Sequence, residues 1–328
     1  MDDALAEWVA EATERMDRLI RDDIAVSGDP FLTATATHLL DAGGKRLRPL
    51  LVLLAAQYGD RERPGVVPAA AVVELVHLAS LHHDDVVDRS ATRRGVDSVN
   101  RRWGNHTAVL VGDYLVARAA MLGAALGRES VADQAHTLTR LVRGQLREAT
   151  GATAGQDPEQ HYLEVVADKT ASLFALAARL GARAGGAPPA VTRALGDYGE
   201  ALGIAFQLAD DLLDLSAKPE HADLRSGVHT MPVLRALRER GSDAARLRRI
   251  LARGPVHDPG ERATAAALLL RSAAVATTRA EVERYADRAG AALRAIPPSA
   301  ATEALADLSR RVVARVVARA PVEQLFGR

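Results

Sequence analysis

The sequence predicts an all-α protein, a bundle of about ten or more helices, and two observations support this fold class. Apolar residues make up 48% of the chain while aromatic residues make up only 3%, and the abundance of alanine and leucine favours helices packed on helices. Apolar side chains recur at three- and four-residue steps in successive segments, as they do along one face of a helix. No linker rich in serine and proline divides residues 1–328, so we expect a single domain.

The charge balance and the composition exclude several classes of function. Lysine plus arginine and aspartate plus glutamate both number 42, so the net charge is zero and no nucleic-acid partner is expected. The chain contains no cysteine, which excludes disulfides and thiolate chemistry. Its acidic first residues do not resemble a signal peptide. The apolar run at 265–270 stops at Arg271, and we expect no segment that spans a bilayer. The sequence therefore predicts a cytoplasmic protein.

The first predicted helices lead to a basic segment. Residues 2–24 carry apolar side chains at helical spacing and predict an amphipathic helix. A second helix is expected to end near Ala42, because Gly43 and Gly44 suit the left-handed backbone that follows many helix C-termini. Pro49 suits the first turn of a third helix.

The basic segment Gly43–Pro49 carries three cations, Lys45, Arg46 and Arg48. The positive end of a helix dipole and basic side chains both favour a bound anion, so this segment is a candidate diphosphate site. The residues alone leave open an ordinary capped turn whose bases are solvated.

The chain is organised around Glu74–Asp88, which reads E-L-V-H-L-A-S-L-H-H-D-D-V-V-D. It begins as an apolar helix and ends in three carboxylates, Asp84, Asp85 and Asp88. On a helix Asp84 and Asp88 share one face, so their charges repel each other, and carboxylates near a helix C-terminus also oppose the helix dipole. A hard cation with oxygen ligands, most simply Mg²⁺, would compensate. A solvated acidic helix end is the alternative.

The second half of the chain repeats this pattern. The stretch Glu200–Asp214 reads E-A-L-G-I-A-F-Q-L-A-D-D-L-L-D, so Asp210, Asp211 and Asp214 have the same D-D-x-x-D spacing behind another apolar run. Two helices that face each other across a cavity could bind one polyanion through several cations. The repetition favours metal binding over two unrelated acidic helix ends.

Five motifs together resemble those of a known family. In chain order they are G-G-K-R-L-R-P (Gly43–Pro49), H-D-D-V-V-D-R-S-A-T-R-R-G (His83–Gly95), G-D-Y-L (Gly112–Leu115), K-T (Lys169–Thr170) and F-Q-L-A-D-D-L-L-D (Phe206–Asp214). Their order and spacing over most of the chain resemble the trans-isoprenyl diphosphate synthases, or polyprenyl synthetases. The resemblance implies the isoprenoid synthase fold, with helices around a central cavity, and a homodimer.

The resemblance also implies roles for individual residues. The residues implied to hold isopentenyl diphosphate are Lys45, Arg48, Arg94 and His77, and those for the allylic diphosphate are Arg93 and Lys169. Thr170 and Gln207 are implied as dipoles near the developing carbocation. The implied Mg²⁺ ligands are Asp84, Asp88 and Asp210, with about three ions bound beside the substrate. Asp85, Asp211 and Asp214 would complete or orient the metal shell, and all six aspartates and Lys169 form the implied catalytic set.

The implied reaction is the ionisation of an allylic diphosphate followed by its condensation with isopentenyl diphosphate. A terpene cyclase is one alternative, since it uses the same bundle with a single substrate. The basic segment and the second aspartate motif argue against it. A non-catalytic partner subunit of another synthase is the other alternative, and the retention of six motif aspartates argues against that, because a scaffold has no physical need for their mutual repulsion.

The residues one turn before Asp84 bear on product length. They are Ala79 and Ser80, where shorter-product relatives often have an aromatic residue. This small pair resembles the long-chain enzymes and predicts products of about six or more isoprene units, C30 or longer, which are directed to membranes. An aromatic ring there would fill the space of several methylenes. A short-chain farnesyl or geranylgeranyl diphosphate synthase is the alternative.

The chain departs from the family pattern after Asp214. Relatives commonly carry a longer loop there with two lysines, and Val228 occupies the place of the second lysine. Loss of a charge-assisted contact of about 1.5–3 kcal/mol would weaken allylic diphosphate binding, unless Lys218, Arg225 or His229 replaces that lysine.

Other polar residues near the motifs are interpreted from their positions. His82 and His83 are adjacent and cannot both face the cavity, so both remain candidates for supporting roles behind the ligands. Gly112 is expected to permit close helix packing, and Asp113 to accept a structural hydrogen bond. Glu148 lies where the family has a residue that faces the cavity.

Overall fold

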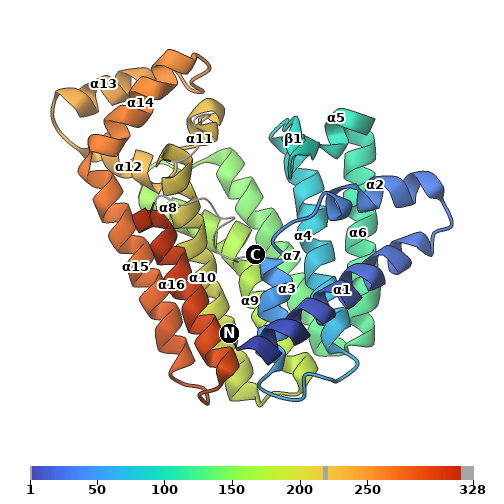
Figure 1. Cartoon of the computed structure of the whole chain (residues 1–328). Helices are drawn as coiled ribbons and strands as arrows, with labels where there is room; N and C mark the ends of the chain where they lie inside the picture. The colour runs from blue at the N-terminus through green and yellow to red at the C-terminus, as the bar shows by residue number, and fades with distance from the viewer. Residues whose placement is uncertain (1, 217–220, 319–328) are drawn as a thin grey trace. The chain divides into compact units, whose positions relative to one another are not determined.

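The structure is a computed structural model that describes residues 2–216 and 221–318. These residues are almost entirely helical (Figure 1), and the one sheet in the described chain is a short hairpin. In it, β1 (Thr92–Arg93) pairs antiparallel with β2 (Val96–Asp97). The predicted all-α fold class is therefore confirmed.

The chain forms two compact units, each assembled from separate stretches of sequence. The first unit comprises residues 1–139, 173–199 and 292–305, as far as these are described. The second unit comprises residues 140–172, 200–291 and 306–328, with the same restriction. Neither unit is a continuous half of the chain, and the single domain stays a prediction.

Most helices lie wholly in one unit. Those of the first unit are α1 (Asp3–Ala25), α2 (Pro30–Asp41), α3 (Leu47–Ala56), α4 (Val66–Val87), α5 (Val99–Trp103) and α6 (Asn105–Ala125). Those of the second unit are α8 (Pro158–Val166), the π-helical turn η1 (Ala167–Ala171), α11 (Ala222–Ser226), α12 (Met231–Arg238), α13 (Ser242–Leu251) and α14 (Pro259–Arg271). Helices with residues in both units are α7 (Arg128–Thr150), α9 (Ser172–Gly185), α10 (Pro189–Ser216), α15 (Ala273–Leu293) and α16 (Ala300–Ala318).

The first helices begin and end where their local chemistry requires. Asp2 caps α1, because its carboxylate accepts a hydrogen bond from the Leu5 N–H at 2.8 Å. Helix α2 ends at Asp41, and Gly43 follows with a φ of 87°, which glycine adopts without strain. Both outcomes confirm the predicted opening helix and the predicted glycine stop.

Helix α4 is the central element of the first unit. It packs against α1, α3 and α6 (Figure 1), and its side chains are buried on nearly every face. Leu75 and Leu78 are fully buried, and burying one leucine contributes roughly 1.5–3 kcal/mol. This core holds the carboxyl end of α4, where the first aspartate motif lies.

Helices α4 and α6 are long and apolar enough to cross a membrane by length and composition alone, which the sequence analysis overlooked. In α4, 67% of the apolar window is buried inside the structure, and in α6 33% is buried. The core helix of a protein that never enters a membrane passes the same test, so this is weak evidence. The expected absence of a membrane span stays a prediction.

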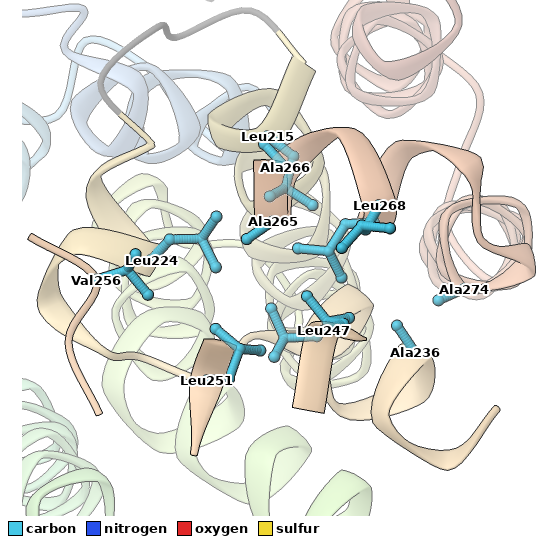
Figure 2. Packing of buried hydrophobic residues seen from close by; sticks show 12 residues of the cluster. Leu215, Leu224, Ala236, Leu247, Leu251, Val256, Ala265, Ala266, Leu268 and Ala274 are labelled. Carbon is cyan, nitrogen blue, oxygen red and sulfur yellow. The ribbon is translucent and has the colours of Figure 1, made fainter. Parts of the chain in front are cut away.

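Figure 2 shows a buried apolar cluster in the second unit. Its members are Leu215, Leu224, Val233, Ala236, Leu247, Leu251, Val256, Ala265, Ala266, Leu268, Leu269 and Ala274. These residues come from the end of α10, from α11 to α14, and from the start of α15. Because Leu215 directly follows Asp214, the cluster anchors the end of the helix that carries the second aspartate motif.

Candidate active site

The first aspartate motif lies at the carboxyl end of α4. Asp84 is half-buried and Asp88, the C-cap residue, is exposed. One helical turn separates them, and the Asp88 N–H donates to the Asp84 carbonyl at 2.8 Å. Asp85, by contrast, is only 1% exposed. The two predicted metal ligands therefore share one face, and the middle aspartate is turned away from solvent.

Arg93 binds the buried Asp85. Its Nε and Nη2 donate to Asp85 Oδ1 at 2.8 and 2.5 Å, and Asn100 Nδ2 donates to the Asp85 carbonyl at 3.0 Å. Burial raises the pKa of Asp85, and the hydrogen bonds from Arg93 oppose that shift. Asp85 thus orients the hairpin that carries the arginines, while the role of Arg93 as an allylic diphosphate ligand stays a prediction.

The hairpin turn directs Arg94 to the basic segment. Arg94 and Gly95 have φ values of 53° and 79°, and a two-residue I′ turn requires two such positive values. Arg94 Nη1 donates to the carbonyls of Leu39 at 2.7 Å and Gly43 at 2.6 Å. The structure therefore brings Arg94 and the basic segment together, as the sequence analysis expects for ligands of one diphosphate.

Glu74, which the sequence analysis did not single out, joins two arginines. It is 1% exposed, and its Oε1 accepts from Arg46 Nη1 at 3.0 Å and from Arg94 Nη2 at 3.3 Å. Arg46 also binds Asp17 of α1, with an Nε to Oδ1 distance of 3.1 Å. Burial raises the pKa of Glu74, and the charges of Arg46 and Arg94 oppose the shift. A carboxylate inside an otherwise apolar helix was the sequence signal for this role.

Arg48 and His77, two predicted isopentenyl diphosphate ligands, lie together. Arg48 Nη1 is 3.2 Å from His77 Nε2, and the guanidinium lies 4.9 Å from the centre of the Phe174 ring. Burial lowers the pKa of Arg48 to about 10. Burial, and then the charge of Arg48, lower the pKa of His77 well below its ordinary value. His77 is therefore neutral at pH 7, so its Nε2 can accept from Arg48, which stays charged. Lys45, the third ligand predicted on the basic segment, is exposed.

In the second aspartate motif, as in the first, the middle aspartate is more deeply buried than the first one. Asp210 is half-buried, whereas Asp211 is 2% exposed. Asp211 accepts a short hydrogen bond from the Tyr162 hydroxyl and another from Gln207 Nε2 at 3.1 Å. Gln207 Oε1 accepts from Thr170 Oγ1 at 3.0 Å. Burial raises the pKa of Asp211 to about 7. The structure thus joins the two predicted dipoles to the middle aspartate, and Tyr162 is a partner that the sequence analysis missed.

Asp214 binds the beginning of α11. Its two carboxylate oxygens accept from the N–H groups of Ala222 at 3.3 Å and Asp223 at 3.2 Å. These groups belong to the first turn of α11, so the carboxylate satisfies helix N–H groups that have no partner within the helix. Asp214 therefore links α10 to α11, and its role in the metal shell stays a prediction.

Lys169 and Thr170 lie in the π-helical turn η1. Lys169 Nζ is 2.5 Å from Glu148 Oε2, and the expected orientation of Glu148 toward a cavity stays a prediction. Gly144 permits the approach, because an added Cβ there would lie 2.7 Å from the Lys169 backbone nitrogen. Single π turns inside helices often mark functional sites.

Asp168, beside Lys169, is bound by three arginines. Arg140 Nε, Arg143 Nε and Arg147 Nη1 lie 2.9, 2.7 and 3.0 Å from its carboxylate oxygens. Burial alone would raise the pKa of Asp168, but the hydrogen bonds from Arg143 and Arg140 lower it below its ordinary value. This cluster, which the sequence analysis missed, fixes η1 on α7.

The C-terminal helices also contribute, although no site could be read there from the sequence. Arg315 of α16 is 3% exposed, and its Nη2 lies 3.6 Å from Asp210 Oδ1. Its Cζ lies 5.2 Å from the centre of the Phe206 ring. A buried cation therefore faces the first aspartate of the second motif.

Comparison with known proteins decides the family. A model of the polyprenyl synthetase family matches residues 29–268. The chain belongs to the polyprenyl synthetase family. It is 42% identical to nonaprenyl diphosphate synthase of Mycobacterium tuberculosis, over 95% of this chain and 93% of that protein. Dimethylallyltranstransferase of the same organism is 39% identical over 92% of this chain and 93% of its own length.

Solved structures of other prenyl synthases have the same fold. Geranylgeranyl pyrophosphate synthase of Corynebacterium glutamicum, complexed with calcium and isoprenyl diphosphate, has a TM-score of 0.86 and 41% identity, covering 96% of this chain and 98% of that one. A decaprenyl diphosphate synthase of Rhodobacter capsulatus has a TM-score of 0.87 and 37% identity, covering 96% and 99%. This polyprenyl synthetase is therefore a transferase of prenyl groups, as its motifs predict.

For several other predicted site residues of this polyprenyl synthetase, the structure gives the position, and the role stays a prediction. Within residues 2–216 and 221–318, no three His, Cys, Asp or Glu side chains gather closely enough to hold a metal ion. Ala79 is 1% exposed, and Ser80 Oγ donates to the His77 carbonyl at 2.8 Å. Lys218 lies outside the described residues. Partial burial lowers the pKa of His229, which makes it a weak substitute for a lysine at neutral pH.

The two adjacent histidines of α4 have structural partners. His82 is fully buried, and its Nδ1 lies 2.7 Å from the Leu78 carbonyl. His83 Nε2 lies 3.3 Å from Asp113 Oδ1, and an added Cβ at Gly112 would come 2.3 Å from the same ring nitrogen. Gly112 therefore permits the close helix packing that the sequence analysis expects, while the role of Asp113 as a hydrogen-bond acceptor stays a prediction.

Proposed function

We propose that this chain is a Mg²⁺-dependent trans-prenyltransferase that condenses an allylic diphosphate with isopentenyl diphosphate. The observation that carries the proposal is the shared design of the two aspartate motifs. In each motif the middle aspartate, Asp85 or Asp211, is buried and bound by a neighbouring side chain. The first aspartate of each, Asp84 or Asp210, is only half-buried. This arrangement keeps carboxylates that repel each other close together. A bound metal ion compensates for that repulsion, whereas in a protein without a metal site the repulsion only destabilises the fold.

The carboxylates fit Mg²⁺, which prefers hard oxygen ligands and binds through one or two carboxylates together with substrate phosphate. We assign Asp84, Asp88 and Asp210 as its ligands, with about three ions per active site. Ions held by these carboxylates would withdraw charge from the allylic diphosphate and so favour its ionisation. Asp85, Asp211 and Asp214 hold the surrounding loops and side chains through the contacts described above.

The other polar residues act directly on the substrates in this proposal. Arg93 and Lys169 stabilise the leaving diphosphate, since guanidinium and ammonium groups donate charge-assisted hydrogen bonds to phosphate oxygens. Lys45, Arg48, Arg94 and His77 hold isopentenyl diphosphate. The support for that assignment is the close contact of Arg48 with His77 and of Arg94 with Gly43. The Thr170 and Gln207 dipoles lie next to the allylic carbocation. The released diphosphate takes the proton that condensation frees.

We propose a long-chain product, about C30 or longer, which passes to a membrane while the enzyme stays cytoplasmic. Ala79, one turn before Asp84, is a small buried residue and not an aromatic one, and a nonaprenyl and a decaprenyl synthase are among the relatives. A geranylgeranyl synthase of similar identity supports the short-chain alternative.

The function is tested by incubating the purified chain alone with farnesyl diphosphate, isopentenyl diphosphate and Mg²⁺, followed by mass analysis of the products. We expect a series of prenyl diphosphates that differ by one isoprene unit and end at C30 or above. A cyclic hydrocarbon would identify a terpene cyclase instead. No turnover by the folded chain would support the partner-subunit alternative, and a series that stops at C15 or C20 would contradict the long-chain proposal.

We also propose that the chain forms a homodimer through α6. Leu110 and Met121 are 62% and 60% exposed, and Val109 is 39% exposed. Leu110 and Met121 are eleven residues apart, three turns along one face of the helix. Exposed apolar surface of this kind is typical of an interface between protein chains. Light scattering should show a dimer that Leu110→Glu dissociates, whereas a monomeric wild-type chain would contradict the proposal.

A further inference from the structure

Arg315 is a buried cation whose N–H groups lack hydrogen-bond partners within the described chain. Three of its nitrogens, Nε, Nη1 and Nη2, are buried and have no hydrogen-bond partner within the described chain. Its nearest charge is Asp210, at 3.6 Å, and the guanidinium lies over the Phe206 ring. A guanidinium carries five N–H donors, so the ring and one ion pair satisfy only part of its capacity.

This arrangement is costly for folding alone. A buried polar group without hydrogen bonds destabilises the folded state, and an apolar side chain of similar size would fill the same space without that cost. Burial lowers the pKa of Arg315, and the charge of Asp210 opposes the shift. The guanidinium is therefore placed where an additional anion would complete its bonding, since arginine binds phosphate oxygens through paired N–H groups.

Arg315 also competes with any metal ion at Asp210. One carboxylate cannot neutralise both cations at once, and a divalent ion at Asp210 repels the guanidinium across a short distance. A diphosphate removes the conflict, because it offers several negative charges and acceptor oxygens to both. The metal and the anion should then bind together more tightly than either binds alone.

We infer that Arg315 is a positioning residue that makes the binding of a divalent cation at Asp210 depend on a bound diphosphate. Without the anion, Arg315 neutralises Asp210 and weakens cation binding. With the anion bound, the N–H groups of Arg315 donate hydrogen bonds to diphosphate oxygens, and Asp210 becomes available to the metal. This inference rests on the proposed function and adds an order to it: the second motif takes up its cation with, and not before, the diphosphate.

The test is Mn²⁺ binding to the purified full chain, measured by calorimetry with and without inorganic diphosphate. For the wild-type chain we expect diphosphate to tighten the weakest Mn²⁺ site. For Arg315→Gln we expect that site to bind Mn²⁺ at least about tenfold more tightly than wild type when diphosphate is absent, because a nearby charge shifts proton affinity at a carboxylate by a similar factor. In Arg315→Gln, diphosphate should then tighten Mn²⁺ binding by a smaller factor than it does in wild type. Arg315→Lys keeps the charge, so without diphosphate its Mn²⁺ binding should match that of wild type.

Arg311→Gln is the matched control, since Arg311 lies on the same helix and pairs with Asp307 at 2.5 Å. It should leave Mn²⁺ binding unchanged. If Arg315→Gln does not fold, Arg315→Met fills the same buried space and takes its place. Mn²⁺ binding by a folded Arg315→Gln or Arg315→Met chain that matches wild type without diphosphate would overturn the inference. These measurements need no turnover. The inference about Arg315 can therefore be overturned while the proposed prenyl transfer holds, and prenyl transfer can be disproved while the inference about Arg315 holds.

Discussion

Replacing Glu74 by glutamine should loosen the basic segment without removing any predicted ligand. Glu74 Oε1 accepts from Arg46 and Arg94 at 3.0 and 3.3 Å. A hydrogen bond to a charged group contributes about 1.5–3 kcal/mol, and a neutral one about 0.5–1.5 kcal/mol. The amide keeps the acceptor oxygen and the arginines stay charged, so each contact remains a hydrogen bond to a charged group and moves toward the lower end of that range, a loss of about 1 kcal/mol. The easier burial of a neutral side chain offsets part of this loss, and we expect a net destabilisation of about 1–2 kcal/mol.

The functional effect of Glu74→Gln should be specific to one substrate. Arg94 and the basic segment are tied together through Glu74, and they carry three of the predicted isopentenyl diphosphate ligands. We expect the Michaelis constant for isopentenyl diphosphate to rise about tenfold, the equivalent of 1.4 kcal/mol. The value for the allylic substrate should change less than about twofold, because Arg93 is held by Asp85 and Lys169 lies on η1, so neither depends on Glu74.

Urea denaturation and steady-state kinetics with each substrate varied in turn measure both effects. Glu62→Gln is the control, because Glu62 accepts a hydrogen bond from Trp8 Nε1 at 2.8 Å outside the predicted site. It should leave both Michaelis constants unchanged. An unchanged Michaelis constant for isopentenyl diphosphate in a folded Glu74→Gln enzyme would refute the reasoning, as would equal increases for both substrates.

Four other changes have defined outcomes. Asp84→Ala should lower turnover by several orders of magnitude while thermal stability stays equal or rises, since a repelling charge is lost. Asp210→Ala should lower turnover as much but also lower thermal stability, because it removes the ion-pair partner of the buried Arg315; near-normal turnover in either variant would exclude that aspartate as a metal ligand. Ala79→Phe should shorten the product seen by mass spectrometry, because the ring occupies the space of several methylenes, and an unchanged distribution would place the length limit elsewhere. Burial lowers the pKa of His82 from 6.5 to about 4, so the unfolded chain binds a proton that the folded chain does not. This contribution is complete above pH 6.5, and about 3 kcal/mol should be lost as the pH falls to 4; urea denaturation should show a smaller loss for His82→Gln. Val228→Lys should lower the allylic Michaelis constant and leave that of isopentenyl diphosphate unchanged, and no change in either would show that the shortened loop does not hold the diphosphate.

Sequence periodicity was sufficient to predict the elements but not their internal partners. The opening helix, the glycine stop after α2 and the apolar helix that ends in Asp84, Asp85 and Asp88 follow from local spacing, because capping and helical period are properties of short segments. The contacts of Glu74 depend on residues 20 and 28 positions away. No local pattern specifies contacts at such separations.

The sequence could not predict which aspartate of each motif is buried and which is partly exposed. The spacing D-D-x-x-D is the same whether or not the middle aspartate faces solvent, and only tertiary packing buries Asp85 against Arg93 and Asp211 against Tyr162. Arg315 was missed for a related reason. Its surroundings in the sequence are those of an ordinary amphipathic helix, and its importance arises from its position next to Asp210.

The most direct test of the central claim is the release of diphosphate by the purified chain with Mg²⁺, given the allylic substrate alone, isopentenyl diphosphate alone, or both. Condensation consumes one isopentenyl diphosphate and releases one diphosphate for each isoprene unit added. We therefore predict sustained release only when both substrates are present, with one diphosphate for each isopentenyl diphosphate consumed. Equal release from the allylic substrate alone, or no release in any of the three mixtures, would contradict the assignment as a prenyltransferase of this reaction.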